Sequence, residues 1–335
     1  MKFSLVICTY LRPQALLELL HSVKAQTLYP SEIIIVDGST NDDTKHILEQ
    51  HVFENLTYHK VEASQRGLTK QRNFGINKVS KSSEVICFLD DDTVLKRNYF
   101  ETILQDFQSS NAIVGVGGVA VNENRWEPKV EGKNYSKYHY YELDGWVCKE
   151  GLRNVVRNYL GLSSPLMPNR MPDFSNGRTC SYPLTGQCYE VDLLIGMSMN
   201  FRADVFKHIS FSNYFEGYGL YEDADFSLRL SKKGNLYVNT AAQLEHHHNK
   251  SGRPNKLKYG KMVIRNGWYV WRVKYPKPSI KAQLKWHATA FLLTVIRFTN
   301  ILTSNSHRRQ EAFTESLGRF IGWVSLIFSK PKVKP

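Results

Sequence analysis

An apolar run that ends in three consecutive carboxylates constrains this chain more than any other feature. Residues Val85 to Leu89 are apolar, and Asp90, Asp91 and Asp92 follow them directly. Strands of a parallel sheet are covered on both faces, so they appear as continuous apolar runs. The run therefore predicts a buried strand. Open α/β sheets bind ligands at the carboxyl ends of such strands, and a divalent cation relieves repulsion among crowded acids. We expect a metal and nucleotide site here, and the alternative is a solvated acidic loop.

Two shorter apolar runs precede this one and end in the same way. The first extends from Phe3 to Thr9 and the second from Ile33 to Val36, which Asp37 follows directly. Residues with helical spacing follow each run. This alternation predicts βαβ units, and therefore an α/β fold with a Rossmann-like, mixed but mainly parallel sheet flanked by helices. Thr9, Asp37 and the three acids are then expected at one edge of that sheet.

No glycine-rich phosphate loop follows the first run. The G-x-G-x-x-G pattern of dinucleotide-binding proteins and the lysine-bearing Walker loop are both absent from this position. Their absence argues against a Rossmann dehydrogenase and against a nucleotidyltransferase with a lysine-bearing phosphate cradle.

The chain carries a strong positive charge. Its 335 residues include 44 lysines and arginines against 31 acids, which gives a net charge of +13. This balance favours anionic partners such as nucleic acid, phosphorylated small molecules or an anionic membrane surface. Because the basic residues are dispersed and no nucleic-acid-binding motif occurs, we expect no nucleic-acid partner. Five cysteines without a CxxC pair, and an N-terminus that leads directly into a strand, predict a reduced, cytoplasmic protein.

Four short segments stand in a fixed order within the first 92 residues: Val6 to Tyr10, Ile35 to Asp42, Gly67 to Gly75, and Phe88 to Asp92. Together they resemble the successive N-terminal motifs of the family 2 inverting glycosyltransferases. The resemblance implies the GT-A type fold and a nucleotide-sugar donor, with UDP- or dTDP-sugars as the expected class. Two residues depart from the family pattern without removing a functional atom, namely Gly38, where a polar residue is commoner, and Gln71, where alanine is commoner.

The resemblance assigns five residues to the donor. Asp37 would bind the base, Arg72 would lie near the base or the diphosphate, and Asp90 would bond the ribose hydroxyls. Asp91 has no distinct family role and is expected to support its neighbours. Thr9, at the end of the first strand, completes the donor-binding set.

Asp92 and one histidine are the expected ligands of a divalent cation, Mg²⁺ or Mn²⁺. Three consecutive histidines start at residue 246, just after a predicted strand. Neighbours on a strand point to opposite faces, so the three cannot bind one ion together. In related enzymes a histidine at this point binds the metal or the diphosphate, and the resemblance assigns that role to His246, with His248 as the rival. Arg253 and Lys256 are then expected along the phosphates. A zinc-binding or merely exposed histidine tract is the alternative.

A cluster of acids at a predicted loop-to-helix junction supplies the candidate base. Isolated acids here would serve as helix caps, but in context Glu222 and Asp223 resemble the family's Glu-Asp motif. Asp223 would be the catalytic base, with Asp225 as the competing candidate and Glu222 orienting the acceptor or the loop. A single base with direct displacement at the anomeric carbon implies inversion. Asn200 lies in a segment that resembles the one beneath the transferred sugar.

The sequence also predicts three regions. Residues 1–121 form the nucleotide-sugar-binding half, and residues 122–250 form the acceptor-binding and catalytic half. Within the latter, the variable segment 122–190 is rich in aromatic residues, which suits either sugar stacking or a self-packed surface excursion. Residues 251–335 form a C-terminal helical extension.

Two helical stripes of apolar residues mark this extension, and neither is long enough to span a bilayer. The first comprises Ile280, Leu284, Ala288, Phe291, Leu292, Val295 and Ile296, and the second Phe313, Leu317, Phe320, Ile321, Val324 and Phe328. They suit helices that lie in the interface of the cytoplasmic leaflet, at the inner face of the cell membrane. Equally, they suit packing on the catalytic domain or a dimer contact.

Two functions remain open at this point. The first is an inverting, metal-dependent glycosyltransferase that acts on a saccharide or polyprenyl-linked acceptor in cell-surface polysaccharide or lipopolysaccharide synthesis. The second is a catalytically silent relative that binds a sugar nucleotide or a glycan. Retention of Asp37, Asp90, Asp92 and Asp223 favours the enzyme, because a silent relative is expected to lose the base or the metal-binding acid.

Overall fold

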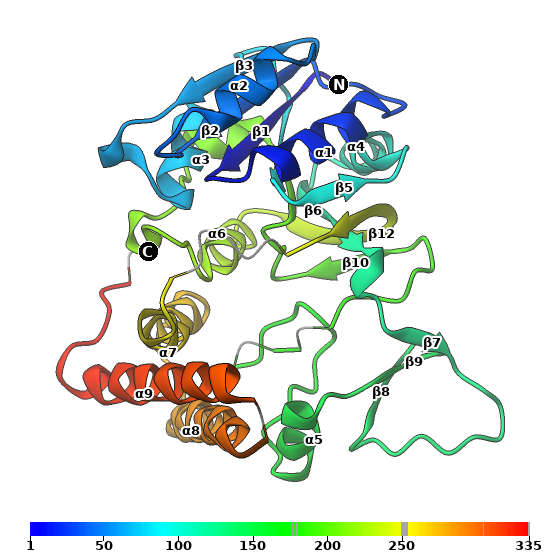
Figure 1. Ribbon diagram of the computed structural model, residues 1–335. Coiled ribbons are helices and arrows are strands. Elements are labelled where there is room, and N and C mark those ends of the chain that lie inside the picture. The colour runs from blue at the N-terminus through cyan, green and yellow to red at the C-terminus, as the bar shows by residue number, and fades with distance from the viewer. Residues whose placement is uncertain (176, 179, 249–253, 304, 334–335) are drawn as a thin grey trace. The chain divides into compact units, whose positions relative to one another are not determined.

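The computed structural model describes residues 1–175, 177–178, 180–248, 254–303 and 305–333 (Figure 1). The chain divides into two compact units. The first combines Met1–Asn124 with Leu184–Arg253, and the second combines Arg125–Pro183 with Pro254–Pro335. Residues 125–183 thus group with the C-terminal helices. The functional assignment of the three predicted regions stays a prediction.

A nine-stranded sheet forms the centre of the first unit (Figure 1). Its strand order is β10-β12-β6-β11-β4-β1-β2-β3, and β5 pairs with β12. The strands are β1 Phe3–Thr9, β2 Glu32–Asp37, β3 Leu56–Lys60, β4 Val85–Asp90, β5 Thr93–Leu95, β6 Ile113–Ala120, β10 Cys188–Val191, β11 Ser198–Arg202 and β12 Asn235–His246. Strands β1, β2, β3, β4, β6 and β12 run in one direction, whereas β5, β10 and β11 run against them. The mixed, mainly parallel sheet is therefore confirmed.

Helices cover both faces of this sheet. They are α1 Pro13–Lys24, α2 Asp43–Glu49, α3 Leu68–Ile76, α4 Tyr99–Ser109 and α6 Glu222–Leu230. On one face, alternate side chains of β1, β2 and β4 form a buried core with α1 and α4. On the other face, Phe88 and Phe201 pack against Phe211 and against Phe226 of α6. Each such buried apolar side chain contributes about 1.5–3 kcal/mol, so this packing stabilises the position of α6 over the sheet.

Glycine lets α3 approach the sheet closely. A Cβ added at Gly75 would lie 2.5 Å from Val6 Cγ1 on β1, so no larger residue fits without a shift. Gly38 and Gln71, the two residues that depart from the family pattern, lie next to each other here. A Cβ at position 38 would lie 2.8 Å from Gln71 Oε1, and the Gln71 amide donates to the carbonyls of Thr9 and Val36 at 3.1 and 2.9 Å. Gly38 therefore makes room for a side chain that ties together the carboxyl ends of β1 and β2.

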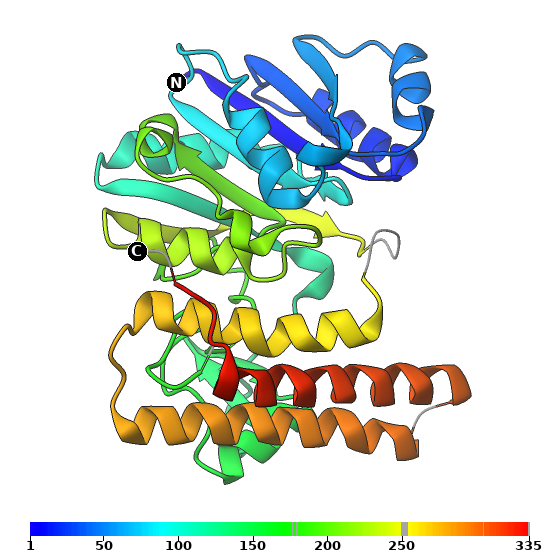
Figure 2. The ribbon, with the colours of Figure 1, turned by 90° about the vertical axis from the view of Figure 1, so that its left-hand side faces the viewer.

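The second unit contains a small antiparallel sheet and four helices. The sheet has the order β7-β9-β8, from Trp126–Pro128, Trp146–Lys149 and Tyr140–Leu143. The helices are α5 Leu152–Tyr159, α7 Lys256–Lys274, α8 Ile280–Thr303 and α9 Ser306–Phe328. Helices α7, α9 and α8 lie side by side (Figure 2). The C-terminal helical extension is confirmed. The strands within the segment 122–190 escape sequence reasoning because they are three or four residues long. Helix α5 was also missed, although Leu152, Val155, Val156 and Tyr159 have helical spacing, because it is only eight residues long.

Candidate active site

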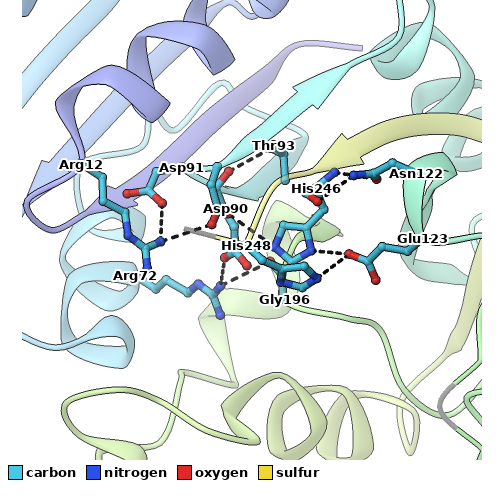
Figure 3. Close-up of polar contacts among 11 residues, drawn as sticks. Arg12, Arg72, Asp90, Asp91, Thr93, Asn122, Glu123, Gly196, His246 and His248 are labelled. Atoms are coloured by element: carbon cyan, nitrogen blue, oxygen red, sulfur yellow. Dashed lines mark hydrogen bonds and ion pairs between the residues drawn. The ribbon is translucent and has the colours of Figure 1, made fainter. Parts of the chain in front are cut away.

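The three acids at the end of β4 point in two directions. Asp91 turns toward β1, where it accepts a hydrogen bond from Thr9 Oγ1 at 2.7 Å. It also accepts one from Arg12 Nη1 at 2.9 Å, which Figure 3 shows. Burial raises the pKa of Asp91 to about 6, although Arg12 and Thr9 act in the opposite direction. Asp90 and Asp92 instead lie with His246 in a group that could hold a metal ion. Asp91 thus supports the loop after β1, and the other two acids form the site.

His246 completes a possible cation site with Asp90 and Asp92. It is the last residue of β12 and pairs with Thr93 of β5, which places it beside the acidic turn. One ligand atom from each of the three residues lies within 4.8 Å of the others, and His246 Nε2 is 3.4 Å from Asp92 Oδ1. Burial disfavours the charged imidazolium, but the carboxylates of Asp92 and Glu123 outweigh it and raise the pKa of His246 to about 10. The negative charge that holds this proton also suits a divalent cation.

Two residues that follow β6 fix the position of His246. Asn122 donates to the carbonyl of His246 at 2.9 Å and accepts from its amide at 3.0 Å. Glu123 Oε1 lies 2.9 Å from His246 Nδ1 (Figure 3). A carboxylate on Nδ1 keeps a proton on that nitrogen, so a metal that displaced the other proton would bind at Nε2. Nε2 is the nitrogen that faces Asp92.

The other two histidines, His247 and His248, have different partners from His246 Nε2. His248 Nε2 lies 2.8 Å from Glu123, and the rings of His246 and His248 are 4.0 Å apart. Within the described part of the chain, Asp90, Asp92 and His246 could hold a cation together, and Glu123, His246 and His248 form a second such group. His247 is exposed and lies 3.6 Å from Glu245. His246 belongs to both groups, and its assignment as the metal ligand in place of His248 stays a prediction.

A buried ion-pair network adjoins the acidic turn. Arg72 of α3 is 2% exposed and pairs with Glu222 at the start of α6. Its Nη2 also lies 3.4 Å from Asp90 Oδ1 and 3.4 Å from the carbonyl of Gly196. Burial raises the pKa of Glu222 to about 8, against the lowering effect of Arg72. Glu222 Oε2 has no hydrogen-bond partner among the described residues, which agrees with that direction.

Asp223 also lies beside Gly196, and two backbone amides hold its carboxylate. Its Oδ2 accepts from Gly196 N at 3.0 Å and its Oδ1 from Ala224 N at 2.8 Å. Burial raises the pKa of the carboxyl, although these two amides lower it. A Cβ added at Gly196 would lie 3.5 Å from Glu222, 3.6 Å from Arg72 and 3.7 Å from Asp223. Three predicted functional side chains thus converge on one glycine of the segment before β11.

Asp225, the competing candidate base, has a different environment. It is fully buried, and its Oδ2 accepts from Arg229 Nη2 at 2.6 Å on the next turn of α6. A carboxylate committed to a helical ion pair is a poor proton acceptor for a substrate. Of the two acids, Asp223 is the one beside the Arg72–Glu222 pair.

The remaining predicted residues lie apart from this cluster. Asp37 ends β2 beside Thr9, and its buried carboxylate accepts from Ser39 N at 2.7 Å and Tyr58 OH at 2.8 Å. Asn200 is buried within β11, where its amide donates to Tyr99 OH and to the Val116 carbonyl. The structure therefore does not bring Asn200 to the acidic turn, and both assignments stay predictions.

Arg253 lies outside the described residues. Lys256 belongs to the second unit, where its Nζ is 3.7 Å from Glu311. Neither expectation about the phosphates is tested.

Sequence reasoning missed Arg12, Asn122, Glu123 and Gly196. The first three follow the carboxyl ends of β1 and β6, so the rule that identified Asp37 and the three acids would also have found them. Gly196 has no comparable signal, because its role comes from how closely other side chains approach its backbone.

Comparisons with known proteins agree with this arrangement. Residues 4–156 match the family model of glycosyl transferase family 2. A glucosyl-dolichyl phosphate glucuronosyltransferase of Haloferax volcanii is 29% identical over 124 residues, which are 36% of this chain and 39% of that protein. The GalNAc(5)-diNAcBac-PP-undecaprenol beta-1,3-glucosyltransferase of Campylobacter jejuni is 26% identical over 138 residues, 41% of this chain and 44% of that protein. The matches thus span about two fifths of these relatives' lengths.

Solved structures support the fold. A crystal structure of GalNAc-T7 with UDP, GalNAc and Mn²⁺ superposes with a TM-score of 0.53 at 14% identity, over 98% of this chain and 56% of that one. With the four ordered motifs and the parallel sheet, the family match assigns residues 4–156 to glycosyl transferase family 2.

Proposed function

We propose that this protein transfers a sugar from a nucleotide-sugar donor to a saccharide or lipid-linked acceptor with inversion at the anomeric carbon. One observation carries the proposal: Asp90, Asp92 and His246 group together beside the buried Arg72–Glu222 pair. A catalytically silent binder of sugar nucleotides is the second candidate, and only turnover separates the two.

The residues present fit a divalent cation. Asp92 and His246 would hold it, with Asp90 close enough to contribute to the same group. Carboxylates and one imidazole form a suitable donor set for Mn²⁺, and Mg²⁺ would be bound mainly through the acids and water. When bound, such a cation stabilises the negative charge that develops on a diphosphate leaving group. The chain's own part is to fix these ligands before the donor arrives.

Asp223 would act as the base. Attack by an acceptor hydroxyl requires a group that removes its proton, and a carboxylate with a raised pKa is better suited to this task than an ordinary one. The amide of Gly196 orients the carboxylate, and Arg72 beside it carries positive charge toward the donor side of the site. A single carboxylate in this position implies direct displacement, hence inversion.

The acceptor and its location are part of the same proposal. The two relatives named above have dolichyl phosphate and undecaprenol in their names, so a lipid-linked acceptor and a role in cell-surface polysaccharide or lipopolysaccharide synthesis are the options to test first. Such an acceptor is presented at a membrane, which agrees with a peripheral position at the inner face of the cell membrane. No helix among the described residues is both long and apolar enough to cross one.

Hydrolysis of a panel of nucleotide sugars tests the proposal, beginning with UDP- and dTDP-sugars. We expect Mn²⁺- or Mg²⁺-dependent turnover of one donor, abolished by EDTA and restored by added metal. Asp92→Asn should lose this turnover, whereas Asp106→Asn should keep it, because Asp106 lies on α4, outside the acidic turn. Donor binding without turnover, even with lipid-linked acceptors, would support the silent binder. Failure of every donor to bind would contradict the site.

Glu123 is expected to set the metal affinity through His246. Glu123→Ala should weaken Mn²⁺ binding about 10–100-fold, because Nδ1 of His246 then loses the carboxylate that orients the ring. Isothermal titration of Mn²⁺ in the absence of donor measures this directly. Glu245→Ala is the matched control, since this half-buried carboxylate lies on β12 next to His246 but pairs with Lys96. Equal affinities in the two variants would contradict the role of Glu123.

A further inference from the structure

Exposed apolar side chains form a single stripe along α8. Ile280, Leu284, Phe291, Val295 and Phe298 recur every three, four or seven residues and are between 40% and 77% exposed. Residues with this spacing share one face of a helix. Leu302, which is 80% exposed, continues the stripe to the end of the helix. The opposite face is buried, with Ala282, Trp286 and Thr289 turned into the unit.

Helix α9 carries a second stripe of the same kind. Phe313, Leu317 and Phe320 are 42–52% exposed and follow the spacing of four and three residues. Ile327 and Phe328 extend the stripe at 74% and 84% exposure. The sequence had allowed these stripes to pack on the rest of the protein. Among the described residues of the second unit, these side chains are exposed.

Both stripes lie on the same side of the α8–α9 pair. The two helices are antiparallel, because His287 meets Trp323 while Arg297 meets Glu315 (Figure 2). An α-helix turns by about 100° per residue, which gives the angle between each stripe and these contact residues. Viewed from the N-terminus of its own helix, each stripe is rotated in the same direction from the contact residues. Because the two helices are antiparallel, rotation in the same direction places both stripes on one side of the α8–α9 pair. The ring of Phe291, from the α8 stripe, lies 6.0 Å from that of Trp323 on α9.

Basic residues flank this apolar face at both ends. Exposed Lys277, Lys281, Lys330 and Lys332 lie near the start of α8 and the end of α9. Exposed Arg308 and Arg309 lie at the start of α9, the opposite end of the pair.

The acids of these two helices are few and paired. Glu315 is buried between Arg297 and Arg319, and Glu311 lies 3.7 Å from Lys256. The side chains that border the apolar face are therefore mainly basic.

We infer that the exposed face of α8 and α9 docks on an anionic lipid surface, with both helices lying in the plane of the interface. An apolar stripe with basic borders is the pattern that such helices show, and their charge complements that of anionic lipids. A second copy of this chain fits less well, because it would bring two positively charged borders together. The inference extends the proposed function by naming the surface that meets the membrane, yet lipid binding needs neither donor nor metal.

Vesicle co-sedimentation of the full chain tests the inference. We expect binding to vesicles that contain phosphatidylglycerol, weaker binding to phosphatidylcholine alone, and release by high salt because part of the attraction is electrostatic. The variant Phe298→Ser/Phe320→Ser/Phe328→Ser should partition onto vesicles at least about ten-fold less, since it removes large apolar groups from the face alone. Its circular dichroism and its donor hydrolysis without vesicles should match those of the unaltered chain.

Two controls separate the outcomes. Val52→Ser/Val130→Ser removes side chains that are 84% and 57% exposed and lie outside α8 and α9, so vesicle binding should persist. Asp223→Asn should also bind vesicles normally, so failure of catalysis and failure of docking are distinguishable. Vesicle binding by the triple variant equal to that of the unaltered chain would overturn the inference. A second result would also overturn the inference: the unaltered chain does not bind vesicles but is a dimer by light scattering, and replacing the three phenylalanines makes it a monomer.

Discussion

Asp223→Asn is expected to lower the rate constant of sugar transfer by about 10²–10⁴-fold. The asparagine keeps the shape of the side chain and one oxygen for the amide of Gly196, but it cannot remove a proton from the acceptor. Binding of the donor should change little, because the cation ligands and Arg72 are untouched. Single-turnover transfer to an acceptor, together with donor titration, measures both quantities.

Neighbouring acids provide the controls for this experiment. Asp225→Asn should lower stability rather than the rate, because Asp225 is fully buried and bonded to Arg229. The pH profile of the unaltered chain should show an acidic limb above the usual range of an aspartate, since burial raises the pKa of Asp223. A transfer rate that survives Asp223→Asn but falls with Asp225→Asn would reassign the base to Asp225.

Arg72→Met is expected to lower the free energy of unfolding by about 3–5 kcal/mol at about pH 9. Arg72 is almost fully buried, and its removal leaves Glu222 without its cation. The ring of Phe211, 5.2 Å from the guanidinium, would also lose a cation–π contact. Chemical denaturation without donor or metal measures the change.

The sign of the pH dependence follows from Glu222. Burial raises its pKa from 4.5 to about 8, so the folded chain holds one more proton than the unfolded chain between these values. This group therefore makes stability fall as the pH rises through that window. Without Arg72 the pKa of Glu222 rises further. Arg72→Met should therefore lower the free energy of unfolding little at about pH 6, where Glu222 is protonated with or without Arg72. The decrease should be largest above pH 8.

A second substitution tests whether Glu222 is the cause. Arg72→Met/Glu222→Gln should recover part of the stability lost at high pH, because no buried charge then remains without a partner. Glu222→Gln alone should flatten the decline between about pH 5 and 8. A loss that is the same at all pH values, and that Glu222→Gln does not reduce, would show that Arg72 acts through packing alone.

The two predictions concern different parts of one cluster. Asp223 is half-buried and held by backbone amides, so its loss changes chemistry more than folding. Arg72 and Glu222 are buried and hold each other, so their loss changes folding first. A rigid, buried pair beneath a more accessible carboxylate is a means of fixing reactive groups before the substrate binds.

The sequence by itself determined the sheet and most of the residues at its edge. Continuous apolar runs ended in polar residues, and parallel strands bring such ends together, so Thr9, Asp37 and the acids after Val85–Leu89 were placed without coordinates. The long stripes of the C-terminal helices were equally clear, because helical spacing is a local property.

Only the tertiary structure decided which of these groups meet. The Arg72–Glu222 pair joins residues 150 positions apart, and the contact of Glu123 with His246 spans 123. No local pattern encodes such contacts, since they depend on the strand order and on how closely α3 approaches the sheet. The same holds for the stripes: their spacing predicted apolar faces, but whether the chain covers them depends on packing between distant segments, and the fold left them exposed.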